Sequence, residues 1–384
     1  MIKINFKDNV KFGINEFAGS LGDFGVILPL FVSIISIANF SVIGVFIVYG
    51  SFLIISGLYY GAPVVIQPLK AVAVLILSLK LDKEIVLGAG LSIGLVMFFF
   101  TITGFLNKLS SLVPKVVIRG VQFGIGLTLC NVAFKDYISV GSNAVDWSLL
   151  AISFLIALLF VRSKRVPVSF LIVGIGIVYS IIFKSHLHFL SLGQGVNHEF
   201  RFEIPSLTNL VSGFILLGIP QIPLSIGNSI FASNLLLNDY FPDKKITVNR
   251  IGLTFSLFNI LGSLFGAIPM SHASNGVAVH YTFGSRSGGS VFILGAMFLI
   301  FGVFFSSHLK DVLNFIPLQT IGVLLFIESF VLIRLIADTS HRISDFSIVL
   351  VVGLIAFGIP YGFLIGLVIG VLLYKYKSKF SFLN

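Results

Sequence analysis

Apolar stretches long enough to cross a lipid bilayer recur along almost the whole chain. A bilayer core of about 30 Å needs roughly 20 mainly apolar residues per helix. Fourteen apolar segments, some of them shorter than this, lie at residues 20–38, 42–59, 67–80, 84–103, 114–130, 146–161, 167–184, 207–234, 249–266, 273–283, 290–306, 316–333, 345–358 and 360–376. Only 10% of the 384 residues are charged, against roughly 25% in soluble domains. The sequence therefore predicts an all-α polytopic membrane protein with 14 transmembrane segments, and not a soluble enzyme.

Two of the segments, 67–80 and 273–283, are too short to span a bilayer. They follow stretches rich in glycine and proline, GAPVVIQP and GAIPMSHA. Short, interrupted segments of this kind are typical of the broken helices at a transporter's binding site. We expect half-helices at spans 3 and 10.

The distribution of positive charge predicts the orientation. If the N-terminus is cytoplasmic, 18 of the 25 Lys and Arg residues fall in cytoplasmic loops, six fall on the other side, and Lys70 remains within the membrane. Cytoplasmic loops are typically enriched in Lys and Arg. Both termini are therefore predicted to be cytoplasmic, in the inner membrane if the source is prokaryotic.

The chain resembles itself at an offset of 205 residues. GAPVVIQPLKAVAV (61–74) aligns with GAIPMSHASNGVAV (266–279), and INEFAGSLGD (14–23) aligns with IPQIPLSIGN (219–228). The matches include polar positions, which apolar composition alone does not explain. Seven spans per copy is an odd number, so the second copy enters the membrane from the opposite side. The sequence thus predicts a 7+7 inverted repeat, 1–184 and 185–384, with a site where the broken helices meet.

Two polar stripes match each other in this repeat. Glu16, Ser20 and Asp23 have the spacing of one helix face, and their counterparts are Gln221, Ser225 and Asn228. Such side chains can simply bond neighbouring helices. A carboxylate deep in a bilayer is costly, by about 2.5–3.5 kcal/mol at least, and usually faces a cavity or a partner. Asp23 is therefore the stronger functional candidate.

The half-helices also predict an anion site. Pro63, Pro68 and Pro269 cannot donate backbone hydrogen bonds, so the helix starts should carry free N–H groups and a positive dipole end. Lys70 lies in the first turn of one half-helix, although a snorkelling lysine is the alternative. The residues that flank the two starts are Gln67, Ser271, His272, Ser274 and Asn275. His272 could donate a hydrogen bond, carry a proton or be a satisfied polar residue.

Two charged residues within predicted spans are candidates for a transport gate. Arg119 in the fifth span and Glu328 in the twelfth could pair with other groups or line a gate. His186, His188 and His198 lack a zinc-site spacing, and Cys130 is the single cysteine. We expect no metal, no cofactor, no nucleotide-binding loop and, without a dense basic stripe, no nucleic-acid partner.

Five ordered segments resemble the molybdate-transporter branch of the SulP sulfate permease superfamily. They are GDFGVILPLF (22–31), GAPVVIQPLKAVA (61–73), RGVQFGIGL (119–127), PQIPLSIGNSIFA (220–232) and GAIPMSHASNGVAVHYTFGSRSGGS (266–290). The resemblance implies a core domain (spans 1–4 and 8–11), a gate domain (spans 5–7 and 12–14) and an anion between spans 3 and 10. It also implies proton coupling and homodimers.

The chain departs from that pattern in two places. Many relatives end in a cytoplasmic STAS domain, whereas this chain stops shortly after Lys379, so we expect no STAS domain. Near span 10 the relatives typically carry a sequence close to CHGAGG, where this chain has Ser271 to Gly276, SHASNG. Because of this difference, molybdate, sulfate and other oxyanions all stay possible substrates.

The expected function is secondary active transport of a tetrahedral oxyanion. The alternatives are a proton-coupled nucleobase permease, which would bind amide edges through Gln221 and Asn228, and an anion channel. Gln221 cannot titrate, so the expected proton carriers are Asp23 first, then Glu16 and His272. A structural clamp on the half-helix is the alternative role for Asp23.

Overall fold

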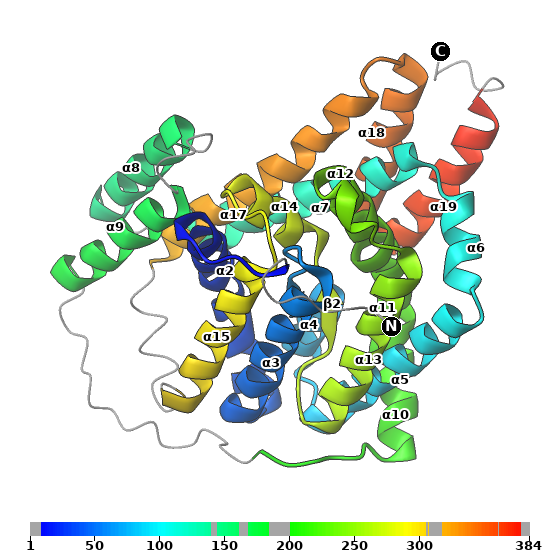
Figure 1. The fold of residues 1–384 in the computed structure, drawn as a ribbon, viewed down its shortest axis with the longest axis horizontal. Helices are drawn as coiled ribbons and strands as arrows, with labels where there is room; N and C mark the ends of the chain where they lie inside the picture. The colour runs from blue at the N-terminus through cyan, green and yellow to red at the C-terminus, as the bar shows by residue number, and fades with distance from the viewer. Residues whose placement is uncertain are drawn as a thin grey trace.

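Helices form almost all of the regular structure in the computed structural model (Figure 1), which describes residues 9–139, 144–160, 168–183, 200–304, 306, 317–359 and 361–377. The first half contains α2 (Ile14–Ala38), α3 (Val42–Tyr60), β1 (Ile66–Pro68), α4 (Lys70–Leu79), α5 (Lys83–Ile102), α6 (Phe105–Leu112), α7 (Lys115–Val132), η1 (Ala133–Ile138), α8 (Ala144–Phe160) and α9 (Val168–Phe183). The second half contains α10 (Leu207–Gly213), η2 (Phe214–Gly218), α11 (Ile219–Leu224), η3 (Ser225–Ala232), α12 (Ser233–Tyr240), η4 (Pro242–Lys244), α13 (Val248–Leu264), β2 (Met270–His272), α14 (Ser274–Thr282), α15 (Gly289–Phe304), α17 (Leu318–Arg334), η6 (Leu335–Thr339), α18 (Ile343–Gly358) and α19 (Gly362–Lys375).

In the described part of the chain, each of the 14 predicted apolar segments overlaps a helix, but the segment 67–80 begins in β1. Five helices there have the length and composition of a membrane crossing, and they are Val42–Tyr60, Lys83–Ile102, Lys115–Ile138, Leu207–Tyr240 and Leu318–Thr339. The longest of them is continuous but irregular, because the π-helical turns η2 and η3 alternate with α10, α11 and α12. Pro223 lies inside this stretch and cannot donate the usual helical hydrogen bond. Apolar length and irregularity together fit a polytopic membrane protein.

The two half-helices begin beside a small antiparallel strand pair that the sequence did not predict. β1 pairs with β2, with Gln67 opposite Ser271. Two further backbone bonds extend the pair, from Leu69 N to Pro269 O and from Ala273 N to Val65 O, both at 3.0 Å. Backbone polar groups inside a membrane protein must find partners within the protein. The extended segments therefore satisfy each other at the centre of the fold.

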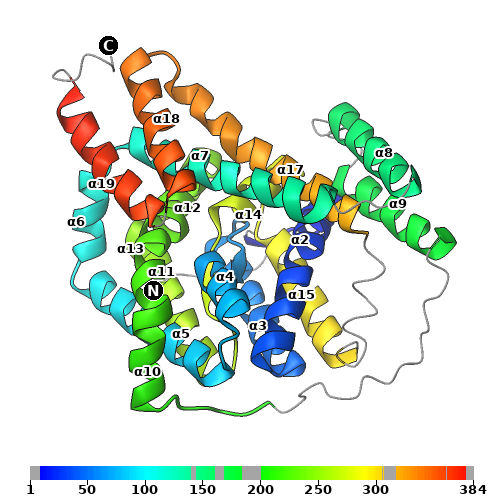
Figure 2. The ribbon, with the colours of Figure 1, turned by 180° about the vertical axis from the view of Figure 1, so that it is seen from behind.

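The helices form two groups. The strand-bearing bundle consists of α2 to α5 and α10 to α15 with both strands, and its most extensive packing joins α3 to α15 and α5 to α13. The outer bundle consists of α7 to α9 and α17 to α19, in which α7 packs on α17 and α18. Within the outer bundle α8 and α9 lie together at one end of the molecule, away from α18 and α19 (Figure 2). The boundary between the bundles runs past the strand pair, because α14 packs on α17.

Glycines permit a close contact between α3 and α15 in the strand-bearing bundle. A Cβ atom on Gly295 of α15 would lie 2.6 Å from the carbonyl oxygen of Gly50 on α3. A Cβ atom on Gly57 would lie 2.5 Å from the carbonyl oxygen of Gly288. Real side chains do not approach a carbonyl so closely, so these positions require glycine for the α3–α15 contact.

Candidate functional site

The N-termini of α4 and α14 lie beside the strand pair. Their N-cap residues, Leu69 and Ala273, provide no side-chain cap. The side-chain oxygen of Gln221 accepts a hydrogen bond from the backbone N–H of Val72 at 3.3 Å. An uncapped helix start carries a partial positive charge and free donors. The geometry therefore places two positive helix ends at the middle of the strand-bearing bundle.

Lys70 adds a full positive charge to the α4 start. Its Nζ atom is buried and has no hydrogen-bond partner among the described residues. Its charge interacts with the carboxylates of Glu328 and Asp23. Lys70 also lines a cavity of about 610 Å³ together with Asn228, Thr128 and Tyr361. A buried lysine without a hydrogen-bond partner at a cavity is suited to bind an anion, because the bare ammonium lacks acceptors.

A chain of hydrogen bonds joins two buried carboxylates across the strand pair. Gln67 Nε2 donates to Asp23 Oδ1 at 2.8 Å, and Asn275 Nδ2 donates to Gln67 Oε1 at 3.2 Å. The same Asn275 Nδ2 donates to Glu328 Oε1. All four side chains are buried. They come from α2, β1, α14 and α17, so the chain crosses from the strand-bearing bundle to the outer bundle.

The polar residues of the second repeat lie around the same helix starts. Ser274 Oγ donates to Asn228 Oδ1 at 2.6 Å. Gln221 Nε2 donates to Ser225 Oγ at 3.1 Å. Ser271 is buried on β2, opposite Gln67. Seven of the predicted site residues therefore gather at the strand pair and the two helix starts, and they are Gln67, Lys70, Ser271, Ser274, Asn275, Gln221 and Asn228.

His272 points into a different cluster. Its Nε2 lies 2.7 Å from Thr254 Oγ1, and Thr254 Oγ1 lies 2.5 Å from the hydroxyl of Tyr60. Its ring stacks on Phe258 with centroids 5.7 Å apart. The imidazole of His272 is thus held by Thr254 and Phe258 in the contact between α3 and α13. The reason is the strand geometry, since successive side chains on β2 point to opposite faces.

His280 lies beside Asp23, although it was not among the predicted site residues. Its Nε2 lies 3.5 Å from Asp23 Oδ2, and its Nδ1 lies 2.9 Å from Ser290 Oγ. Both residues are buried. The repeat could not reveal this histidine, because its counterpart 205 residues earlier is Leu75. The available signal was a histidine within an apolar half-helix.

Glu16 serves the start of α15. Its carboxylate accepts from the backbone N–H groups of Arg286 and Ser290, each at 2.9 Å, and from Ser287 Oγ at 3.0 Å. A carboxylate at a helix N-terminus is stabilised by the free N–H groups and the dipole. These contacts favour a capping role for Glu16.

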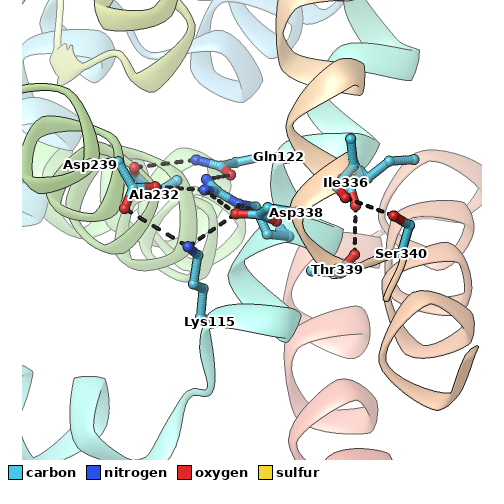
Figure 3. A network of polar contacts seen from close by, with 10 residues as sticks. Lys115, Gln122, Ala232, Asp239, Ile336, Asp338, Thr339 and Ser340 are labelled. Atoms are coloured by element: carbon cyan, nitrogen blue, oxygen red, sulfur yellow. Dashed lines mark hydrogen bonds and ion pairs between the residues drawn. The ribbon is translucent and has the colours of Figure 1, made fainter. Parts of the chain in front are cut away.

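Arg119 joins the two bundles at another place. Figure 3 shows its surroundings, with Lys115, Asp239 and Asp338 labelled. Its Nη2 lies 2.5 Å from Asp239 on α12 and 2.7 Å from Asp338 on η6. Its Nη1 donates to Gln122 at 2.9 Å, and Lys115 pairs with Asp338 at 3.0 Å. Asp239 and Asp338 were not predicted, because only the tertiary fold brings them to Arg119. A second cavity, of about 850 Å³, adjoins this network and is lined by Arg119, Arg286, Arg334, Tyr240, Tyr281 and neighbouring residues.

The described residues contain no group of three or more His, Cys, Asp or Glu side chains placed to hold a metal ion. Residues 186, 188 and 198, which carry the three loop histidines, lie outside the described residues. The candidate site consists of the starts of α4 and α14, the amide and hydroxyl side chains around them, Lys70, and the carboxylates of Asp23 and Glu328.

A polar, charged site at two broken helices inside an apolar helical bundle defines a polytopic membrane transporter. The family model for "Molybdate transporter of MFS superfamily" matches residues 15–129 and 213–332, which together are more than half of the chain. The chain belongs to this molybdate transporter family.

Curated relatives agree with this assignment. Molybdate transporter 1 of Arabidopsis thaliana is 28% identical over an alignment 357 residues long, gaps included, and the alignment covers 81% of this chain and 77% of the relative. Molybdate transporter 2 of the same plant is 28% identical over an alignment 382 residues long, gaps included, and the alignment covers 86% of this chain and 81% of the relative.

Solved structures share the fold. SLC26A9 matches with a TM-score of 0.66 and 14% identity, over 98% of this chain and 67% of that protein. The transmembrane domain of the cyanobacterial bicarbonate transporter BicA matches with a TM-score of 0.60 and 16% identity. The match covers 95% of this chain and 99% of that domain. The predicted resemblance to molybdate transporters is thus confirmed, and the protein is an integral membrane protein.

Proposed function

We propose that this protein is a secondary active transporter of a tetrahedral oxyanion, molybdate or sulfate, driven by protons. The observation that carries this proposal is Lys70, a buried lysine in the first turn of α4 and beside a cavity. It has no hydrogen-bond partner in the part of the chain that the structure describes. A dianion can accept hydrogen bonds from backbone N–H groups at a helix start and from an ammonium group at once. The relatives named molybdate transporters support the choice of substrate.

The oxyanion would bind between α4 and α14. Lys70 would neutralise part of its charge, the Nδ2 group of Asn228 would donate to one oxygen, and the Ser274 hydroxyl would turn from Asn228 Oδ1 toward another. Asn275 would stay bonded to Gln67 and Glu328. The oxygen of Gln221 now accepts from the Val72 N–H. A substrate oxygen can take over this donor when Gln221 turns aside.

The two bundles would move against each other during transport. In this proposal the strand-bearing bundle is the core (spans 1–4 and 8–11) and the outer bundle is the gate (spans 5–7 and 12–14). Three features support a 7+7 inverted repeat over 1–184 and 185–384. The strands pair antiparallel, each half-helix follows a strand, and the aligned glycines Gly61 and Gly266 both have positive φ, 61° and 69°. Both termini would be cytoplasmic, and the protein would form homodimers in the inner membrane if the source is prokaryotic.

Asp23 is the first candidate for the proton carrier. It is buried, and its Oδ2 atom has no hydrogen-bond partner among the described residues, although His280 lies 3.5 Å away. Glu16 is engaged in capping α15, and His272 is engaged with Thr254. Both stay on the list of candidates behind Asp23.

Flux measurements in proteoliposomes test the proposed function. Purified protein should accumulate labelled molybdate or sulfate against its gradient when the outside is acidified. Uptake of uracil or xanthine instead would support a nucleobase permease, which the four amide side chains Gln67, Asn275, Gln221 and Asn228 could also serve. Conductance that is only downhill would indicate an anion channel. Either of these results, without oxyanion accumulation, overturns the proposal.

A further inference from the structure

Glu328 is the outer bundle's contribution to the central hydrogen-bond chain. It lies on α17, its side chain is 2% exposed, and it accepts from Asn275 of α14. Asn275 also donates to Gln67, which in turn donates to Asp23. The two carboxylates therefore lie at opposite ends of one chain, one in each bundle.

The partner of Glu328 has a free acceptor. Asn275 Oδ1 is buried and has no hydrogen-bond partner among the described residues. A buried carbonyl oxygen without a donor is unfavourable. A protonated carboxyl group beside an amide would complete a pair of bonds, with Nδ2–H donating to Oε1 and the acid O–H donating to Oδ1. An ionised Glu328 can supply only the first of these bonds, because a carboxylate has no donor.

From this arrangement, and resting on the proposed oxyanion transport, we propose that Glu328 binds a proton when the substrate binds and thereby makes the outer bundle part of the coupling mechanism. The proton from solution attaches to a carboxylate oxygen of Glu328 and is released when the substrate leaves. No other bond is made or broken.

The charges that face Glu328 explain why substrate and proton bind together. Among the described residues, Lys70 of α4, Asp23 of α2 and His280 of α14 are the titratable groups whose charge acts on Glu328. On the other helices around α17, Arg119 of α7 is held by Asp239 and Asp338, and Asp146 of α8 accepts from the hydroxyl of Tyr179. Lys135 and Asp136 of η1 are exposed.

One lysine cannot balance two carboxylates and an arriving dianion. Nearby negative charge favours the neutral form of a carboxyl group. The substrate therefore increases the proton affinity of Glu328, and by reciprocity the proton increases the affinity for the substrate.

Movement of the strand-bearing bundle against the outer bundle gives a second reason why Glu328 should bind a proton when the substrate binds. If α14 moves past α17, the bond from Asn275 to Glu328 breaks. An ionised carboxylate left alone inside the membrane is strongly unfavourable, whereas a neutral acid is much less so. Protonation of Glu328 would thus permit the movement only when the substrate is bound.

Proton uptake on substrate binding tests this role without requiring transport. Purified protein in weakly buffered detergent solution is mixed with molybdate while a pH dye is recorded, and the affinity is measured across a pH series. The wild type should take up protons, and its affinity should rise as pH falls, by up to about tenfold per pH unit for each proton. Glu328→Gln should take up fewer protons and should bind with a flatter pH dependence. The matched control is Glu84→Gln, which replaces an exposed carboxylate on α5 and should behave as the wild type.

The outcomes separate this inference from the proposed function. If the wild type neither binds nor transports molybdate or sulfate, the proposed function fails, and this inference fails with it. If the wild type takes up protons and Glu328→Gln takes up as many, only the role of Glu328 is overturned. If Glu328→Gln does not fold, Glu328→Asp is measured instead. Its displaced carboxyl group should shift the pH midpoint of proton uptake, and an unchanged midpoint would overturn the role.

Discussion

Arg119 on α7 and Asp239 on α12 form an ion pair, with Nη2 and Oδ2 2.5 Å apart, that ties the outer bundle to the strand-bearing bundle. Arg119 is buried, whereas the Asp239 side chain is 32% exposed. Asp338 and Lys115 complete the network within the outer bundle. This pair must open if the two bundles separate at this end, beside the 850 Å³ cavity.

We predict that Asp239→Asn opens this end more often. A partly exposed ion pair contributes up to about 1 kcal/mol, so the open population should rise up to about fivefold. The measurement is the labelling rate of a cysteine introduced at Thr282, which lines the cavity, in a Cys130→Ser background. Asp243→Asn, at an exposed carboxylate in η4, is the control and should not change the rate. Equal rates for Asp239→Asn and the parent protein would show that the pair does not hold the bundles together.

Lys70→Ala should weaken oxyanion binding while the protein remains folded. Hydrogen bonds that involve a charged group contribute about 1.5–3 kcal/mol, which corresponds to a loss of roughly ten- to a hundredfold in affinity. Titration calorimetry with molybdate on purified protein measures this loss. Lys80→Ala, at the exposed end of the same helix, should leave the affinity unchanged. A Lys70→Ala variant that binds as tightly as the parent excludes Lys70 from the site.

Asp23→Asn should separate exchange from uphill transport. The asparagine oxygen can still accept from Gln67, but the side chain can no longer titrate. Exchange of labelled molybdate across the membrane should therefore persist, and accumulation driven by a proton gradient should fail. If Asp23 only clamps the half-helix, accumulation stays nearly intact. Normal accumulation by this variant would eliminate Asp23 as a carrier.

Glu16→Gln should affect stability rather than coupling. The amide replaces one acceptor oxygen by a donor, so one of the N–H groups at the start of α15 loses its partner, at a cost of about 1–3 kcal/mol. Thermal unfolding in detergent should shift to lower temperature, whereas proton-driven accumulation, normalised to folded protein, should be kept. Loss of accumulation with unchanged stability would instead make Glu16 a coupling residue.

Gly295→Ala should destabilise the contact between α3 and α15. The added methyl group would lie 2.6 Å from the carbonyl oxygen of Gly50, which is backbone and cannot turn away. Overpacking of this kind typically costs about 1–3 kcal/mol. Gly174→Ala on α9 is the control, because no atom of the described residues comes within 4 Å of the place that its Cβ would occupy. The unfolding temperatures of the two variants in detergent measure the difference, and equal values would contradict the close α3–α15 contact.

The sequence alone determined where the helices lie and which of them are broken. The apolar run from Val42 to Tyr60 can be predicted as a helix without knowing what it packs against, because length and hydropathy are local properties of the chain. The prolines and glycines before Lys70 and Ser274 likewise mark the interrupted helices locally. The repeat at an offset of 205 residues paired Asp23 with Asn228, and the position of Gln67 just before a half-helix predicted that it flanks the same site.

Which side chains meet depends on how distant parts of the chain pack together. β1 and β2 pair across some 200 residues, and their alternation turns His272 toward Thr254 while Gln67 bonds to Asp23. Asp239 and Asp338 reach Arg119 because three helices converge there. His280 and Glu328 join the site because α14 packs between α2 and α17. Such contacts depend on the rotation and register of helices far apart in the chain, and hydropathy does not specify either when almost every face of a helix is apolar.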